Sequence, residues 1–165
     1  MDIYIIRHAD ALALGERGVT ADEDRPLSER GEAQSRTVGA ALLRHGITLD
    51  KVITSPYLRA RQTAEEMLRS WPPPLPEVHV CADLVPDGKP KKLARFLRGL
   101  GSSNVALVGH QPHLGIWTGW IIGSKNANID LAKAGIVHVT CDKPKKGLGI
   151  LHWMVDPEWF EDGGK

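Results

Sequence analysis

Two short apolar runs, residues 3–6 and 105–108, constrain the fold of this chain more than any other feature of its sequence. The first run is bounded by Asp2 and Arg7, and neither run contains a charged residue. Continuous apolar runs of this length are typical of β-strands that are covered on both faces. Strands of this kind occur in parallel sheets flanked by helices, so the two runs indicate an α/β fold.

The rest of the chain alternates between strand-like and helical patterns. Further strands are expected at residues 51–54 and 78–81, and residues 135–141 and 148–155 are expected to pair as a hairpin. Helices are expected from a Ser28 cap to about residue 45, from Ser55 to about residue 68, at residues 93–100 and at residues 114–122. This alternation predicts a three-layer α/β/α sandwich with a mainly parallel central sheet, to which the hairpin adds an antiparallel edge.

Length and composition are those of one ordinary globular domain. The chain has 165 residues, of which 42% are hydrophobic and 25% are charged. A chain of this size can bury one sizeable core, and these fractions are usual for globular proteins. We therefore expect a single domain over residues 1–160, followed by a frayed tail at residues 161–165.

The same totals exclude several classes of partner and location. The net charge is only +1, whereas nucleic-acid binders usually carry a clear basic excess, so no nucleic-acid partner is expected. No apolar run approaches the roughly 18 to 20 residues that span a bilayer, and the N-terminus resembles a strand more than a signal peptide. Cys81 and Cys141 lie far apart in the sequence and are expected to be reduced thiols. These features predict a cytoplasmic protein with no membrane partner.

Polar side chains follow three of the predicted strands, at the point where each strand ends. Arg7 and His8 follow the first strand, Arg59 lies just after the second, and His110 follows the strand at residues 105–108. Ligands of open α/β sheets bind outside the carboxyl ends of the strands. If these strands are parallel and close together, the four side chains converge on one crevice.

The chemistry of such a crevice points to phosphate. The guanidinium groups of Arg7 and Arg59 offer paired donors that match phosphate oxygens. Ser55 as N-cap and Pro56 at the first helical position are expected to begin a helix there, whose N-terminus would add free N–H groups and a positive dipole end. His110 adds one more hydrogen-bond donor. The sequence therefore predicts a phosphate pocket.

His8 has a different expected role from its neighbours. Positive charge nearby disfavours the imidazolium form, so the pKa of His8 should fall and its ring should stay neutral. A neutral imidazole is a nucleophile, and covalent catalysis divides a difficult hydrolysis into two easier transfers. The adjacent arginines would then stabilise the phosphoryl group as it moves onto His8.

At these residues the chain resembles a known family. Residues 5–9 (Ile-Ile-Arg-His-Ala), residues 55–64 and the Gly109-His110 pair resemble the three motifs of the histidine phosphatase superfamily, which has a phosphoglycerate mutase-like fold. Residues 24–31 and the compact length resemble its SixA-like branch of phosphohistidine phosphatases. The likeness spans nearly the whole chain. It implies that His8 is phosphorylated and that Arg7, Arg59 and His110 bind the phosphate.

Three further positions bear on this resemblance. Arg61 lies two residues after Arg59 on the predicted helix, so the two side chains should point in different directions, and Arg59 holds the motif position. Arg25 is either a residue of the pocket rim or a plain structural residue. Ala9 stands where the superfamily usually has glycine, a change that SixA-like sequences often carry.

No strong acid motif accompanies the pocket. Asp83 and Asp87 are the carboxylates in the stretch that carries the acid in larger relatives, and both are better explained as simple turn residues. A phosphohistidine substrate needs little acid assistance because imidazole is a good leaving group. The chain also lacks a large insert, so its crevice should be open enough for a phosphohistidine on a protein surface. Both points favour a phosphorylated signalling protein as substrate.

Three alternatives to this interpretation remain. The first is an enzyme that acts on small phosphoesters. The second is a pocket that binds phosphate or a phosphoprotein without turnover. A zinc site at His8, His110 and His113 is a third alternative, but the adjacent arginines would repel a cation. We therefore expect catalysis without a metal or other cofactor.

Overall fold

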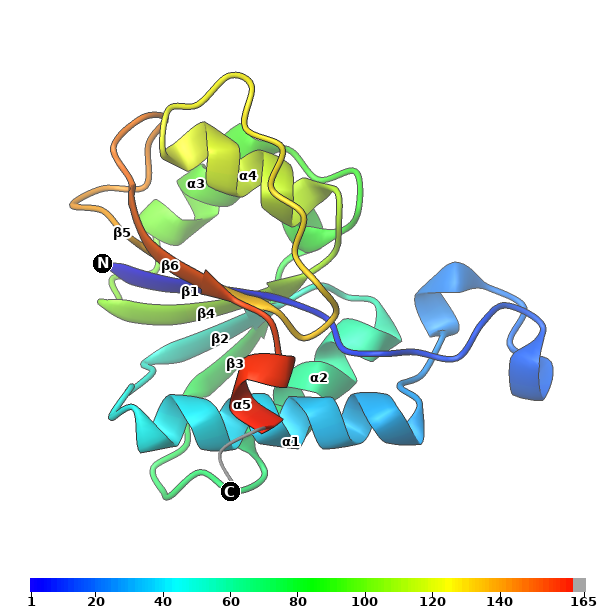
Figure 1. Cartoon of the computed structure of the whole chain (residues 1–165). Helices are drawn as coiled ribbons and strands as arrows, with labels where there is room; N and C mark the ends of the chain where they lie inside the picture. The colour runs from blue at the N-terminus through cyan, green and yellow to red at the C-terminus, as the bar shows by residue number, and fades with distance from the viewer. Residues whose placement is uncertain (162–165) are drawn as a thin grey trace.

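A six-stranded mixed sheet forms the centre of the structure, a computed structural model that describes residues 1–161 (Figure 1). The strands lie in the order β3-β2-β4-β1-β5-β6. Their bounds are Asp2–Arg7 (β1), Lys51–Thr54 (β2), Glu77–Val80 (β3), Asn104–Gly109 (β4), Ile136–Thr140 (β5) and Ile150–Val155 (β6). The first four strands are parallel, while β5 pairs antiparallel with both β1 and β6. The predicted parallel sheet with an antiparallel edge is confirmed.

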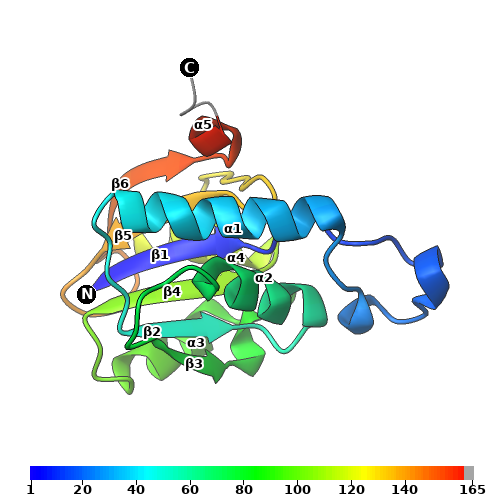
Figure 2. The same ribbon diagram turned by 90° about the horizontal axis from the view of Figure 1, so that it is seen from below.

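Helices cover both faces of this sheet, which confirms the three layers (Figures 1 and 2). Helices α1 (Glu29–Arg44), α2 (Leu58–Leu68) and α5 (Glu158–Glu161) lie on one side, and α3 (Pro90–Arg98) and α4 (His113–Ile121) lie on the other. Three short 3-10 helices also occur in the connections, η1 (Glu16–Gly18), η2 (Asp22–Asp24) and η3 (Ala82–Leu84). None of the helices in the described part of the chain is long and apolar enough to cross a bilayer.

The apolar runs of β1 and β4 are explained by two hydrophobic cores, one on each face of the sheet, to which both strands contribute. In β1, Ile3 and Ile5 face the core under α3 and α4, whereas Tyr4 and Ile6 face the core under α1 and α2. Successive side chains of a strand point to opposite faces, so a strand with helices on both sides needs an apolar residue at every position.

Several predicted boundaries differ from those in the structure. Helix α2 begins at Leu58, because the backbone N–H of Ser55 still donates to the carbonyl oxygen of Val108 at 2.9 Å and keeps Ser55 in the sheet. Helix α3 ends at Arg98, where Gly99 forms its C-cap, so the prediction extended it too far. Glu161, the first residue of the predicted tail, belongs to α5, and residues 162–165 lie outside the described residues, so the tail stays a prediction.

A long connection between β1 and α1 extends past the carboxyl ends of the parallel strands (Figures 1 and 2). It carries η1 and η2, and η2 lies against α2. The two arms of the connection are joined where the backbone N–H of Leu12 donates to the Pro26 carbonyl oxygen at 3.0 Å. This connection places η2 beside the edge of the sheet where the phosphate pocket is predicted.

Candidate active site

The order of the strands brings the predicted site residues together. Strand β4 lies between β1 and β2 and runs parallel to both, so their carboxyl ends share one edge. Beyond this edge the N–H of His8 still donates to the Gly109 carbonyl oxygen at 2.9 Å. The rings of His8 and His110 lie 4.9 Å apart between centroids, and Arg59 contacts His8 from the first turn of α2. Adjacent parallel strands therefore suffice to bring His8, Arg59 and His110 together.

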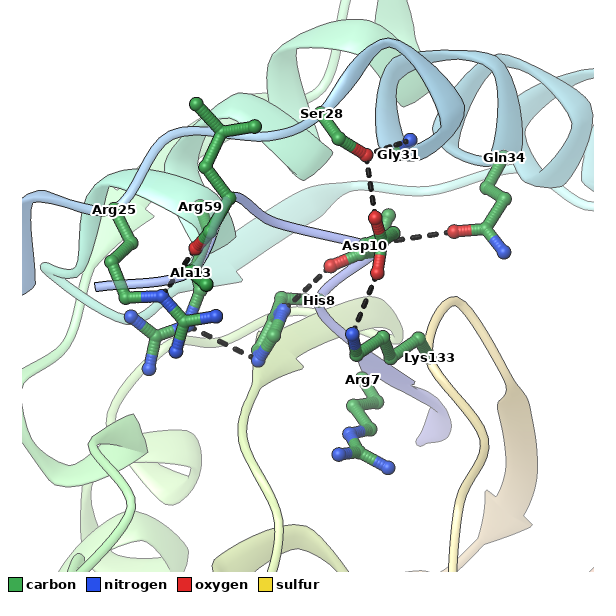
Figure 3. A network of polar contacts seen from close by, with 12 residues as sticks. Arg7, His8, Asp10, Ala13, Arg25, Ser28, Gly31, Gln34, Arg59 and Lys133 are labelled. Carbon is green, nitrogen blue, oxygen red and sulfur yellow. Dashed lines mark hydrogen bonds and ion pairs between the residues drawn. The ribbon is translucent and has the colours of Figure 1, made fainter. Parts of the chain in front are cut away.

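His8 is held with one ring nitrogen directed toward its arginine neighbour (Figure 3). Its side chain is buried, and Nδ1 lies 2.7 Å from the carbonyl oxygen of Ala9. A carbonyl oxygen can only accept, so Nδ1 carries the proton and Nε2 carries the free electron pair. Arg59 Nε donates to that Nε2 at 3.2 Å. The geometry thus fixes both the tautomer and the direction in which His8 can attack.

The surroundings keep both histidine rings neutral. Burial is the main cause that lowers the pKa of His8 to about 3, and the positive charges of Arg59 and Arg7 lower it further. Burial likewise lowers the pKa of His110 to about 2, with His8 and Arg59 as further causes. A neutral imidazole at position 8 has the electron pair that a nucleophile needs.

Arg59 is the most enclosed cation of the site. It is 4% exposed and donates through Nε to His8 and through Nη2 to Asp22 Oδ2 at 3.0 Å. Its Nη1 donates to the backbone carbonyl oxygen of Asp22 as well. Arg61, two residues further along α2, is exposed. The side chains of Arg59 and Arg61 therefore point in different directions, as predicted.

Arg25 and Arg7 lie on different sides of His8 (Figure 3). Arg25 Nη1 donates to Asp22 Oδ1 at 3.0 Å, and Arg25 Nε donates to the Leu12 carbonyl oxygen at 2.6 Å. Arg25 therefore lies at the rim, next to Arg59. Arg7 is half-buried, and its Nη1 donates to the Leu131 carbonyl oxygen at 2.6 Å. Its Nε is buried without a partner in the part of the chain that the structure describes.

Two residues of the second motif support the site in ways that sequence reasoning missed. Ser55 was expected to cap α2, but its Oγ lies 2.9 Å from His110 Nε2 and helps to orient that ring. Tyr57 places its ring edge against His110, with 4.9 Å between centroids, and its face under the Arg59 guanidinium at 5.0 Å. The aromatic residue within the motif was the available signal for Tyr57.

A polar network around Asp10 anchors the chain that follows His8 (Figure 3). The Asp10 carboxylate accepts from Lys133 Nζ at 2.6 Å and from Ser28 Oγ at 2.6 Å, while its backbone N–H donates to Gln34 Oε1. Ser28 in turn caps α1, as predicted. A Cβ atom at Gly31 would lie 1.9 Å from the Asp10 carbonyl oxygen, so this close approach requires glycine. Lys133 also adds positive charge near His8, and its local sequence does not predict this role.

The two candidate acids lie on the side of the site next to His113. The charges of Asp83 and Asp87 act on His113, although burial dominates and lowers its pKa. His113 is 1% exposed and packs against Gly88, and neither ring nitrogen has a partner among the described residues. Within residues 1–161 no group of three or more His, Cys, Asp or Glu side chains is arranged to hold a metal ion.

His8 is expected to stay neutral from about pH 8 down to about pH 5. Its pKa in the folded protein is lowered to about 3, against an ordinary value of about 6.5. Below about pH 6.5 the unfolded chain binds a proton at this residue and the folded chain does not, so stability falls as the pH drops toward 3. Nitrogen-15 NMR of the ring should show an unchanged Nδ1–H tautomer through this range. A titration midpoint near 6.5 would contradict the described environment.

Known proteins share both the motifs and the fold of this chain. Residues 3–84 match the family model of the histidine phosphatase superfamily (branch 1). An uncharacterised protein of Picosynechococcus is 36% identical over 167 aligned residues, which cover 97% of this chain and 94% of that protein. Phosphohistidine phosphatase SixA of Escherichia coli is 29% identical over 162 residues, which cover 95% of this chain and 94% of SixA.

The likeness extends to three dimensions. A structure of the protein histidine phosphatase SixA complexed with tungstate has a TM-score of 0.82 to this chain at 27% identity. The superposition covers 95% of this chain and 97% of the other. Sequence, fold and the convergence of the three motifs therefore agree, and the chain belongs to the histidine phosphatase superfamily, in its SixA-like branch.

Proposed function

We propose that this protein hydrolyses phosphohistidine on a signalling protein, through a covalent phosphoryl intermediate on His8 and without a metal. Membership of the superfamily supports phosphatase activity in general. The observation that carries the more specific proposal is the state of the His8 ring. Nδ1–H donates to the Ala9 carbonyl oxygen, so Nε2 holds the lone pair of the ring, which accepts from Arg59 Nε in the free protein.

In the first step, His8 Nε2 attacks phosphorus in line with the bond to the substrate imidazole. A bond forms between Nε2 and phosphorus, the P–N bond of the substrate breaks, and its electron pair passes to the leaving nitrogen. The other nitrogen of the substrate ring carries a proton, so the ring leaves as neutral imidazole. Phosphorylation at Nε2 leaves the His8 ring positively charged while its Nδ1 proton remains in place. The Ala9 carbonyl oxygen, 2.7 Å away, stabilises that charge. The arginines stabilise the charge on the phosphoryl oxygens.

In the second step, a water molecule attacks the phosphoryl group on His8. The bond between phosphorus and Nε2 breaks and its electron pair returns to the ring, which becomes neutral again. The water oxygen and its two protons join the phosphoryl group as inorganic phosphate, which then exchanges protons with solvent. Burial and the neighbouring cations lower the pKa of His8, so the neutral ring is a good leaving group at this stage.

The balance of charge in the site favours an imidazole leaving group. Hydrogen bonds from Arg25 and Arg59 hold the pKa of the nearby Asp22 carboxyl below its usual range, although desolvation opposes them. Asp22 is therefore ionised near neutral pH and has no proton to give to an alkoxide. A leaving imidazole has less need of a proton donor than an alkoxide has. Resemblance to a protein named phosphohistidine phosphatase supports the same choice.

We place this activity in the cytoplasm. Cys81 and Cys141 are both free and both buried. Thiols persist in the reducing environment of the cytoplasm, and burial raises the pKa of both, which lowers their reactivity further.

The test is the release of phosphate, with a chelator present, from a panel of substrates. The panel contains a phosphohistidine protein, a phosphoserine peptide and small phosphoesters. Fast release from the phosphohistidine protein, together with an acid-labile and alkali-stable phosphoenzyme, is the expected result. Preference for a small phosphoester would refute phosphohistidine as the substrate and would leave the proposed mechanism unchanged. Release that stops with the chelator would overturn the metal-free mechanism, and no release from any substrate would leave a phosphate-binding module.

A further inference from the structure

The carboxylate of Asp22 bridges two arginines at the mouth of the site. Its Oδ2 accepts from Arg59 Nη2 at 3.0 Å, and its Oδ1 accepts from Arg25 Nη1 at 3.0 Å. Each oxygen thus binds one guanidinium. Asp22 belongs to η2, in the connection that extends past the sheet edge, and it is far in sequence from Arg59. The contact is therefore made by the folding back of this connection onto α2.

A carboxylate between two guanidiniums presents the same ligand atoms as two oxygens of a phosphoryl group. Carboxylate and phosphate both accept paired N–H donors from arginine, with similar geometry. In addition, Arg59 Nε donates to the Nε2 electron pair of His8. All three nitrogens of the Arg59 guanidinium are thus engaged within the protein, and the nucleophile itself is covered.

We propose that Asp22 is an internal occupant of the phosphate pocket, and that the incoming phosphoryl group displaces it and binds Arg25 together with Arg59. The inference rests on the proposed function only in taking a phosphoryl group as the ligand. It assigns to Arg25 a direct role in binding, and it makes Asp22 a competitor of the substrate.

The two sides of this contact differ in their freedom to move. The Arg59 side chain is 5% exposed and is fixed to α2, whereas the Asp22 side chain is 43% exposed. The Nε–H of Arg25 stays bound to the Leu12 carbonyl oxygen while its Nη1 is free to exchange partners. A buried guanidinium needs an anion beside it, because an unpaired buried charge is strongly destabilising. Asp22 supplies that anion in the free protein, and the phosphoryl group supplies it in the complex.

The difference in charge between the Asp22 carboxylate and a phosphoryl group decides which of them binds the two arginines. The Asp22 carboxylate has one negative charge, whereas a phosphoryl group near neutral pH carries up to two and has a third oxygen for Arg7 or His110. Monovalent anions gain little by displacing Asp22, so the internal carboxylate raises the selectivity of the pocket for dianionic phosphoryl groups.

Asp22→Asn tests the proposal by direct binding of tungstate, measured by calorimetry without any turnover. The amide has the same shape but no charge, so it competes less for the two guanidiniums. We expect the dissociation constant of tungstate to fall about tenfold, the scale expected for one nearby charge at a partly exposed position. A dissociation constant that is unchanged or higher would overturn the proposal, because Asp22 would then only position Arg59.

Asp24→Asn is the matched control. Asp24 belongs to the same 3-10 helix and is exposed, and it forms no ion pair among the described residues. Its replacement removes the same charge from the same segment and should leave tungstate affinity within about twofold of wild type. An equal gain in both variants would show a general effect of net charge and would overturn the specific role of Asp22.

Two further measurements keep the proposal open to refutation if Asp22→Asn folds poorly. In the wild-type protein, saturation with tungstate should shift the backbone amide NMR signals of residues 22–25, and unchanged signals would overturn the displacement. Arg25→Gln should weaken tungstate binding about tenfold, as expected for loss of one charged donor, and unchanged affinity would overturn the role of Arg25. Because these experiments measure binding, failure of phosphohistidine hydrolysis would leave their outcome intact, and the reverse also holds.

Discussion

Phosphate release by the His8→Ala variant is expected to fall at least about 1,000-fold, the scale seen when a nucleophile is removed from a covalent mechanism. The first step requires a bond between phosphorus and His8 Nε2, which the alanine variant cannot form. Single-turnover measurement with a phosphohistidine protein gives the rate directly. The acid-labile phosphoenzyme should disappear in the same experiment. Turnover at the wild-type rate would refute the mechanism.

Two controls separate chemistry from folding and binding in this experiment. His79→Ala removes a partly exposed histidine from the edge strand β3 and should leave phosphate release unchanged. Tungstate should still bind to His8→Ala, because the guanidiniums of Arg7 and Arg59 remain. Thermal unfolding of the variant shows whether loss of the buried ring has weakened the fold. A variant that folds and binds tungstate but does not turn over isolates the nucleophile.

The central strands and their convergence were predictable from the sequence for a physical reason. Strands β1 and β4 are covered on both faces, so their central positions are all apolar and the pattern is unambiguous over a few residues. Parallel strands also place their carboxyl ends at one edge, so residues such as His8 and His110 that follow two neighbouring strands must lie close together. The prediction therefore needed only local patterns and one rule of topology.

Residues whose roles depend on distant partners were not predictable in this way. Ser55 precedes a proline and has the local pattern of a helix cap, and its Oγ does accept from the Tyr57 N–H at 3.3 Å, but its contacts with Val108 in the sheet and with His110 are long-range. Lys133 reaches Asp10 across 123 positions of the chain. Asp22 is one of three acidic residues in a row, and local sequence does not indicate which of them folds back onto the arginines. Tertiary contacts assign these roles.

Replacement of Arg59 by alanine is expected to lower kcat/KM about 100- to 1,000-fold, as loss of one preorganised charged donor does at other transition states. Arg59 is the buried guanidinium that contacts the nucleophile, so no solvent ion can take its place without moving into the site. Arg61→Ala is the matched control, because Arg61 lies on the same helix with an exposed side chain. Comparable losses in the two variants would mean that the net charge of α2, and not the geometry of Arg59, assists the reaction.

The Arg59→Lys variant distinguishes charge from geometry within the same position. A lysine restores the positive charge but offers a single ammonium group, which cannot contact Asp22 and His8 with the spacing of the guanidinium nitrogens. We expect kcat/KM of Arg59→Lys to recover at most about a tenth of the wild-type value. Full recovery would mean that Arg59 acts only through its charge. A loss confined to kcat, with KM unchanged, would place the paired donors of Arg59 in the transition state and leave ground-state binding to Arg7 and Arg25.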